Sequence, residues 1–175
     1  PSQSWSTPHT YARLCSEPEP APMAHTSSTR ELLKAHFGHD HFLPLQERII
    51  ASVLDGNDTL ALMPTGGGKS LCYQLPSLRL DGLTLVVSPL IALMTDQVNA
   101  LQANGLAAAF INSTIPYNEM RRLQMEALAG RIRILYVAPE RLALDSFQAF
   151  LDQLNVSLIA VDEAHCISEW GHNFR

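Results

Sequence analysis

The residues best suited to chemistry form a glycine-rich segment, Thr65-Gly66-Gly67-Gly68-Lys69-Ser70, which follows an apolar run at 59–63. Glycines let the backbone bend until successive N–H groups point at one anion, and side chains there would block a phosphate. Lys69 could then reach the β- and γ-phosphates of a nucleotide, and the Ser70 hydroxyl could ligate Mg²⁺. The pattern G-x-x-x-x-G-K-[ST] is incomplete, because Met63 stands at its first glycine. The segment predicts an ATP site, with a glycine-rich hairpin loop as the alternative.

A second chemical group is the acidic pair Asp162-Glu163, which follows the apolar, β-branched run 156–161. Such a run is typical of a buried parallel strand, and an open α/β sheet binds its ligands at the carboxyl ends of its strands. Asp162 is predicted to hold Mg²⁺ through water, and Glu163 to polarise the attacking water. An acidic helix start is the alternative interpretation. The presence of Lys69 upstream favours nucleotide hydrolysis.

Four segments carry a longer pattern: 63–74, 86–97, 136–142 and 162–175, the last beginning Asp-Glu-Ala-His-Cys-Ile-Ser-Glu-Trp-Gly. Together they resemble the RecQ family of superfamily 2 DNA helicases, over about residues 29–175. The resemblance implies ATP-dependent unwinding, 3′ to 5′, in recombination and repair, with ATP and Mg²⁺ as cofactors and single-stranded or partly duplex DNA as partner. It also implies that a second RecA-like domain, absent from this chain, completes the ATP site. The chain alone is therefore expected to bind nucleotide weakly and hydrolyse it negligibly.

Residues 37–46 resemble the adenine-reading motif of that family. Gln46 is expected to select adenine through its amide, and His39 to stack on the base. The chain departs from the family pattern at Leu43, where an arginine is usual, and at Leu45, where a glycine is common. Without the resemblance, Gln46 would be a solvated residue in the first turn of a helix.

The resemblance also assigns residues that would contact DNA. Ser88, at the end of a strand, is expected to meet a DNA phosphate, with a plain strand-to-helix turn as the alternative. Trp170 and Phe174 are expected to stack on unpaired bases, and His165 to relay that contact to Glu163. Core packing of the aromatic side chains remains an alternative. A zinc site would draw on His165, Cys166 and His172, but a fourth ligand is missing.

Periodicity predicts the elements that position these groups. Strands are expected at 59–63, 83–88, 107–111, 132–137 and 156–161, with helices at 69–80, 90–103, 117–129 and 140–154. Two helices precede them, the first capped by Ser28 and Glu31 and the second opened by Pro44. The alternation implies parallel βαβ units. The predicted fold is a RecA-like P-loop NTPase domain with a doubly wound parallel sheet, present over 29–175 as an incomplete first motor domain.

Length and composition limit the classes of protein to which this chain can belong. The 175 residues suffice for one α/β domain, and the net charge of −5 argues against coating nucleic acid by charge alone. Pro1–Ser28 holds five prolines and almost no aliphatic residues, which predicts a disordered tail. No apolar run approaches a membrane span, no secretory signal is visible, and three scattered cysteines suggest a reducing compartment. A bacterial cytoplasm is expected, or a nucleus in a eukaryote.

Two other functional classes are considered. One is a non-enzymatic truncated remnant that binds nucleotide or nucleic acid without unwinding. The other is a small P-loop kinase, which the acidic box and the adjoining aromatic segment disfavour.

Overall fold

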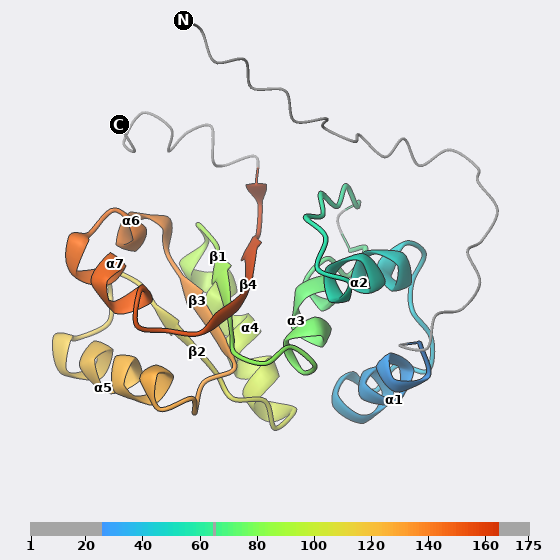
Figure 1. The fold of residues 1–175 in the computed structure, drawn as a ribbon, viewed down its shortest axis with the longest axis horizontal. Coiled ribbons are helices and arrows are strands. Elements are labelled where there is room, and N and C mark those ends of the chain that lie inside the picture. The colour runs from blue at the N-terminus through green and yellow to red at the C-terminus, as the bar shows by residue number, and fades with distance from the viewer. Residues whose placement is uncertain (1–25, 65, 165–175) are drawn as a thin grey trace, which may run out of the picture.

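In the described part of the chain, four parallel strands form a central sheet (Figure 1). The structure, a computed structural model, describes residues 26–64 and 66–164. Its sheet has the order β2-β3-β1-β4, and the strands are β1 Leu83–Val87, β2 Ala108–Ile111, β3 Ile134–Val137 and β4 Val156–Val161. Each neighbouring pair runs parallel. This sheet confirms the predicted RecA-like architecture.

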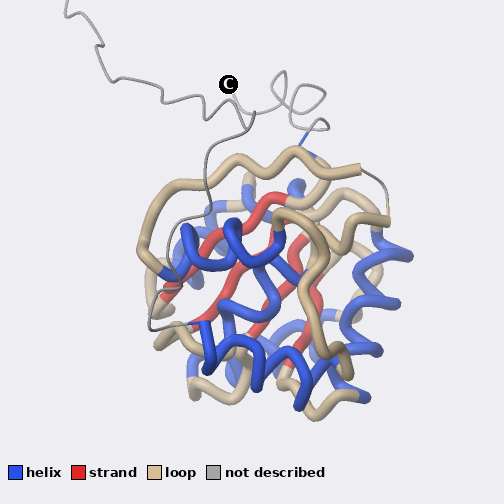
Figure 2. The backbone as a smooth tube through the Cα atoms, turned by 90° about the vertical axis from the view of Figure 1, so that its right-hand side faces the viewer, coloured by secondary structure: helices blue, strands red, loops and turns tan. Residues whose placement is uncertain are grey.

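Helices cover both faces of the sheet, as Figures 1 and 2 show. They are α1 Thr26–Phe37, α2 Gln46–Leu54, α3 Leu71–Ser77, α4 Ile91–Ala103, α5 Tyr117–Leu128, α6 Pro139–Leu142 and α7 Asp145–Leu151. Along β3, Leu135 packs in the core that includes residues of α5 and α7, and Tyr136 packs in the core that includes residues of α3 and α4. Successive strand residues point to opposite faces, so both faces are apolar and both are covered. Within the described residues, no helix is long and apolar enough to cross a membrane.

A separate small core joins the first three helices. Leu33 of α1, Ile50 of α2, and Leu71 and Leu75 of α3 are buried together. This cluster fixes the start of α2 beside the glycine-rich segment, since α3 follows that segment directly. The helices therefore carry the predicted adenine-reading residues to the phosphate loop.

The predicted strand at 59–63 is wrong in this structure, because these residues form no helix or strand. Leu60 and Leu62 are 73% and 83% exposed. On β4, whose only described partner is β1, Ile159 is 63% exposed. An apolar run becomes a strand only when a neighbouring backbone accepts its hydrogen bonds, and that pairing is a tertiary property which periodicity does not report.

The predicted helix at 140–154 is also wrong as a single element. It divides into α6 and α7, because Leu144 between them is extended (φ −88°, ψ 122°). The break lets Phe147 and Phe150 of α7 enter the core. Asp145, in the first turn of α7, is the sequence signal for a new helix start that the prediction overlooked.

The ends of three other helices differ from prediction. The first helix begins at Thr26, inside the segment predicted as tail and before Ser28. The second begins at Gln46, two residues after Pro44. The third covers only Leu71–Ser77 of the predicted 69–80. Residues 1–25, which make up most of the predicted tail, lie outside the described part of the chain.

Candidate active site

The three glycines of the glycine-rich segment occupy positions in a tight turn that disfavour a side chain. Gly66 and Gly68 have φ angles of 81° and 69°, in the left-handed region that side chains disfavour. At Gly67, an added Cβ would lie 2.9 Å from the Pro64 carbonyl oxygen. Thr65, also predicted to contact nucleotide, lies outside the described residues. The turn is therefore built from backbone, as an anion-binding loop requires.

The side chains of Lys69 and Glu163, which are 94 positions apart in the sequence, are in direct contact. The Lys69 Nζ donates to Glu163 Oε1 at 3.1 Å, and the two side chains are 36% and 25% exposed. Lys69 closes the glycine-rich turn, whereas Glu163 follows β4, so the contact joins the two predicted catalytic segments. Glu163 also has a φ of 54°. Left-handed backbone at a residue other than glycine is strained, and such strain concentrates at functional sites.

Asp162 is the buried acid of the site, 7% exposed. Its backbone N–H donates to the Val87 carbonyl at 2.9 Å, which ties the end of β4 to the end of β1. Its Oδ1 accepts from the Glu163 N–H at 3.1 Å. Burial raises the pKa of Asp162, the charge of Glu163 raises it further, and Lys69 opposes the rise. A divalent cation beside Asp162 would relieve this cost.

Ser70 lies at the N-terminus of α3, where its hydroxyl accepts from Gln97 Nε2 at 3.2 Å. The contact was not predicted, although Gln97 stands in the segment 86–97 that carries the family resemblance. Within the described residues, no group of three or more His, Cys, Asp or Glu could hold a metal. Asp162 and Ser70 therefore offer oxygen ligands, but the described residues alone do not complete the coordination shell of a metal ion.

Gln46 is buried against the phosphate loop. Its Oε1 accepts from the Leu43 N–H at 2.8 Å, and its Nε2 donates to the Gly68 carbonyl at 3.1 Å. This amide therefore ties the predicted adenine-reading segment to the loop. Its role in reading adenine stays a prediction, as does stacking by His39, which is exposed.

Leu45, immediately before Gln46, is in the left-handed region with a φ of 73°. The departure from a common glycine noted in the sequence thus falls on a position where glycine would be unstrained. The strained residue caps α2 without a side-chain hydrogen bond.

Ser88 follows β1 and is 1% exposed. Its Oγ has no hydrogen-bond partner within the described residues, and the same holds for Asn112 Nδ2 after β2 and Arg141 Nε in α6. All three lie at the carboxyl edge of the sheet. The predicted DNA-coupling residues His165, Trp170 and Phe174, and the zinc alternative, lie outside the described residues.

Comparison with known proteins identifies the family. The DEAD/DEAH box helicase family matches residues 43–175, which contain the glycine-rich turn, the acidic pair and Ser88 at the carboxyl edge of the sheet. The chain belongs to this family.

Relatives within the helicases confirm the RecQ resemblance. The ATP-dependent DNA helicase RecQ of Haemophilus influenzae is 50% identical over 144 residues, which are 82% of this chain and 23% of that protein. The RecQ of Bacillus subtilis is 46% identical over 147 residues, 83% of this chain and 25% of the relative. This chain thus spans about a quarter of the length of these relatives.

A solved structure confirms the helicase fold independently. It is that of a hypothetical ATP-dependent RNA helicase from Sulfolobus tokodaii, with a TM-score of 0.64 at 23% identity. The alignment covers 83% of this chain and 44% of the other. At this identity the likeness shows a shared fold.

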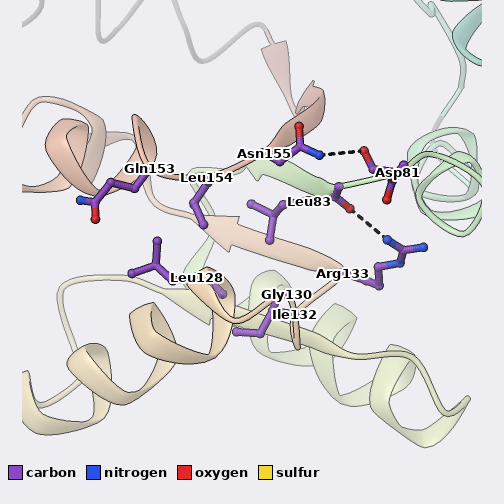
Figure 3. A pocket seen from close by; sticks show the side chains of 11 residues that line it. Asp81, Leu83, Leu128, Gly130, Ile132, Arg133, Gln153, Leu154 and Asn155 are labelled. Atoms are coloured by element: carbon purple, nitrogen blue, oxygen red, sulfur yellow. Dashed lines mark hydrogen bonds between the residues drawn. The ribbon is translucent and has the colours of Figure 1, made fainter.

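The helicase domain also has a pocket of about 250 Å³ at the opposite edge of the sheet. It is lined by residues that precede β1, β3 and β4, among them Asp81, Arg133 and Asn155 (Figure 3). Arg133 donates to the Gly82 carbonyl and Asn155 to the Asp81 carbonyl, both at 3.3 Å. These contacts bind loop to loop at the amino ends of the strands. The pocket is therefore separate from the active-site edge.

Proposed function

We propose that this chain is the nucleotide-binding part of an ATP-dependent DNA helicase of RecQ type, moving 3′ to 5′ along single-stranded DNA. The ion pair between Lys69 and Glu163 carries the proposal, because it brings two segments 94 positions apart to one point at the sheet edge. The names of the RecQ relatives support ATP and DNA as ligands. The direction of movement rests on the family resemblance alone.

The residues present fit Mg²⁺ held jointly with a triphosphate. Magnesium is usually bound by one or two carboxylates together with phosphates and water. Asp162 supplies a buried carboxylate, Ser70 a hydroxyl, and the turn at Gly66 to Gly68 carries no side chain that would obstruct phosphates. When bound, the ion would neutralise charge on the phosphates.

Three charged side chains would then have separate roles in ATP hydrolysis. Among the described residues, the Lys69 ammonium pairs with the Glu163 carboxylate, so a triphosphate would compete for that ammonium group and draw it away from Glu163. The Glu163 carboxylate, released from Lys69, could then take a proton from water. Asp162, tied to the ends of β4 and β1, keeps its position through the exchange.

DNA is proposed to run along the edge formed by Ser88, Asn112 and Arg141. The Ser88 hydroxyl, the Asn112 amide nitrogen and the Arg141 Nε–H have no hydrogen-bond partner in the described part of the chain, and each can donate to a phosphate. The three come from three successive strand ends, as an extended ligand would require. Because the atoms are buried, a phosphate reaches them only after a local opening of this edge.

The test uses the longer protein that contains these residues, assayed for ATP hydrolysis with and without single-stranded DNA. Glu163→Gln should keep ATP binding but reduce turnover to below about a tenth, since a tenfold loss is only about 1.4 kcal/mol. Glu126→Gln is the matched control, because Glu126 also pairs with a basic side chain, Arg131, away from the site. A Glu163→Gln variant that turned over like the control would contradict the proposal. A wild type that neither hydrolyses ATP nor unwinds DNA would instead support the non-enzymatic remnant.

A further inference from the structure

A chain of side-chain hydrogen bonds connects Ser70 to the interior of the sheet. Gln97 of α4 donates from Nε2 to Ser70 Oγ at 3.2 Å. Its Oε1 accepts from Gln74 Nε2 of α3 at 2.6 Å. Gln74 Nε2 also donates to the hydroxyl of Tyr136 on β3 at 3.0 Å. This network was not predictable from the sequence, because its members are separated by up to 66 positions.

The orientation of the amides in this network is internally consistent. Reversing the Gln97 amide alone would set its NH₂ group against the NH₂ group of Gln74, so that two donors would face each other. The orientation of Gln74 therefore determines that of Gln97. In this arrangement Gln97 presents an N–H, rather than an oxygen, to Ser70.

Burial anchors the far end of the network. Gln74 and Tyr136 are 6% and 1% exposed, whereas Ser70 and Gln97 are half-buried. Burial also raises the pKa of Tyr136, so its hydroxyl stays protonated. The network thus runs from a buried end at Tyr136 in the sheet to a partly exposed end at Ser70 in the phosphate loop.

We propose that Gln97 is a positioning residue that orients the Ser70 hydroxyl toward the metal ion of a Mg²⁺–triphosphate complex. A serine hydroxyl has two lone pairs and one proton. With the Gln97 N–H on one lone pair, the other is left for a cation and the proton points away from both. The inference rests on the proposed function, because it needs Mg²⁺ and a triphosphate at Ser70.

The test measures the affinity of this chain for ATP by calorimetry, once with Mg²⁺ and once with a chelator. Gln97→Met keeps the length of the side chain but removes both hydrogen bonds. It should weaken binding about three- to tenfold with Mg²⁺ and leave metal-free binding unchanged, since the hydrogen bond that orients Ser70 is lost. In a Ser70→Ala background the same substitution should have no further effect, because Gln97 acts through Ser70.

Gln102→Met is the matched control. Gln102 lies on the same helix and donates to the Ala108 carbonyl at 2.8 Å, so its loss tests a structural hydrogen bond unrelated to Ser70. It should leave both affinities as in wild type. If Gln97→Met lowers the melting temperature, Gln97→Ala replaces it in the same assay.

The outcomes distinguish the positioning role of Gln97 from the proposed function on which it rests. Equal loss of affinity with and without Mg²⁺, or an effect that persists in the Ser70→Ala background, would overturn the role of Gln97 alone. Wild-type affinity in the Gln97 variant would do the same. A wild-type chain that binds no ATP would overturn the proposed function, and the role of Gln97 with it.

Discussion

At the scale of single residues, Asp162 is held in a position that disfavours its own ionisation. Burial and the neighbouring Glu163 raise its pKa in the folded chain, whereas in the unfolded chain an aspartate ionises near pH 3.9. Ionisation therefore costs more in the folded state than in the unfolded state. The stability that Asp162 contributes below about pH 3.9 is lost as the pH rises through its raised folded pKa.

The substitution Asp162→Asn should recover that stability. The amide stays neutral, and its oxygen can still accept from the Glu163 N–H. The melting temperature should rise at pH 7, by about 2–4 °C for each kcal/mol recovered, and stay unchanged near pH 3.5. Thermal unfolding measured across this range checks the result, with exposed Asp58→Asn as the control. An equal gain at both pH values would show that ionisation is not the cause.

At the scale of elements, the strands of the sheet differ in how much stability their side chains provide. Ile134 of β3 is 0% exposed and Ile159 of β4 is 63% exposed. Ile134→Ala should lower the free energy of unfolding by about 2–5 kcal/mol, because it leaves a cavity. Ile159→Ala should cost no more than about 1 kcal/mol, since its side chain is largely in water already. Denaturant unfolding of the two variants provides the comparison, and similar losses would mean that Ile159 is covered in solution.

Prediction from sequence succeeded where local pattern and burial agree. The observed strand Leu83–Val87 and helix Tyr117–Leu128 each end within one residue of the prediction, because long apolar runs and helical periodicity are local signals. It failed at 59–63, where strand formation depends on a partner, and at Leu144, where core packing of the following helix overrides helical propensity.

The same division holds for the site. The motifs located Lys69, Asp162 and Glu163, and the structure places Lys69 and Glu163 in direct contact. The bond from Gln97 to Ser70 was not predictable, although Gln97 lies in the segment 86–97, because its partner is set by the packing of α4. The left-handed backbone at Glu163 was not predictable either, because glycine is the usual sequence signal for that conformation and this residue is a glutamate.

At the scale of the whole molecule, we propose that the chain holds one side of a nucleotide site. It spans about a quarter of its RecQ relatives. We expect the longer protein to supply an arginine that stabilises charge on the transferred phosphoryl group, which is worth a factor of about 10³–10⁵. The 175-residue chain should therefore hydrolyse ATP at least about a thousandfold more slowly than the longer protein. Single-turnover rates of the two forms check this expectation, and equal rates would show that this chain contains the complete site.

The most direct test of the central claim is the binding of Mg²⁺ and ATP to this chain, measured by calorimetry for wild type, Lys69→Ala and Lys34→Ala. Lys34, the other lysine of the chain, pairs with Asp40 at 2.8 Å and is exposed, so its loss controls for removing a charged pair. The wild type and Lys34→Ala should bind alike. Lys69→Ala should lose detectable binding while keeping its melting temperature within a few degrees, because its ion pair is partly exposed and contributes only about 1 kcal/mol or less. Equal affinity of Lys69→Ala and wild type would contradict the assignment of this turn as the nucleotide site.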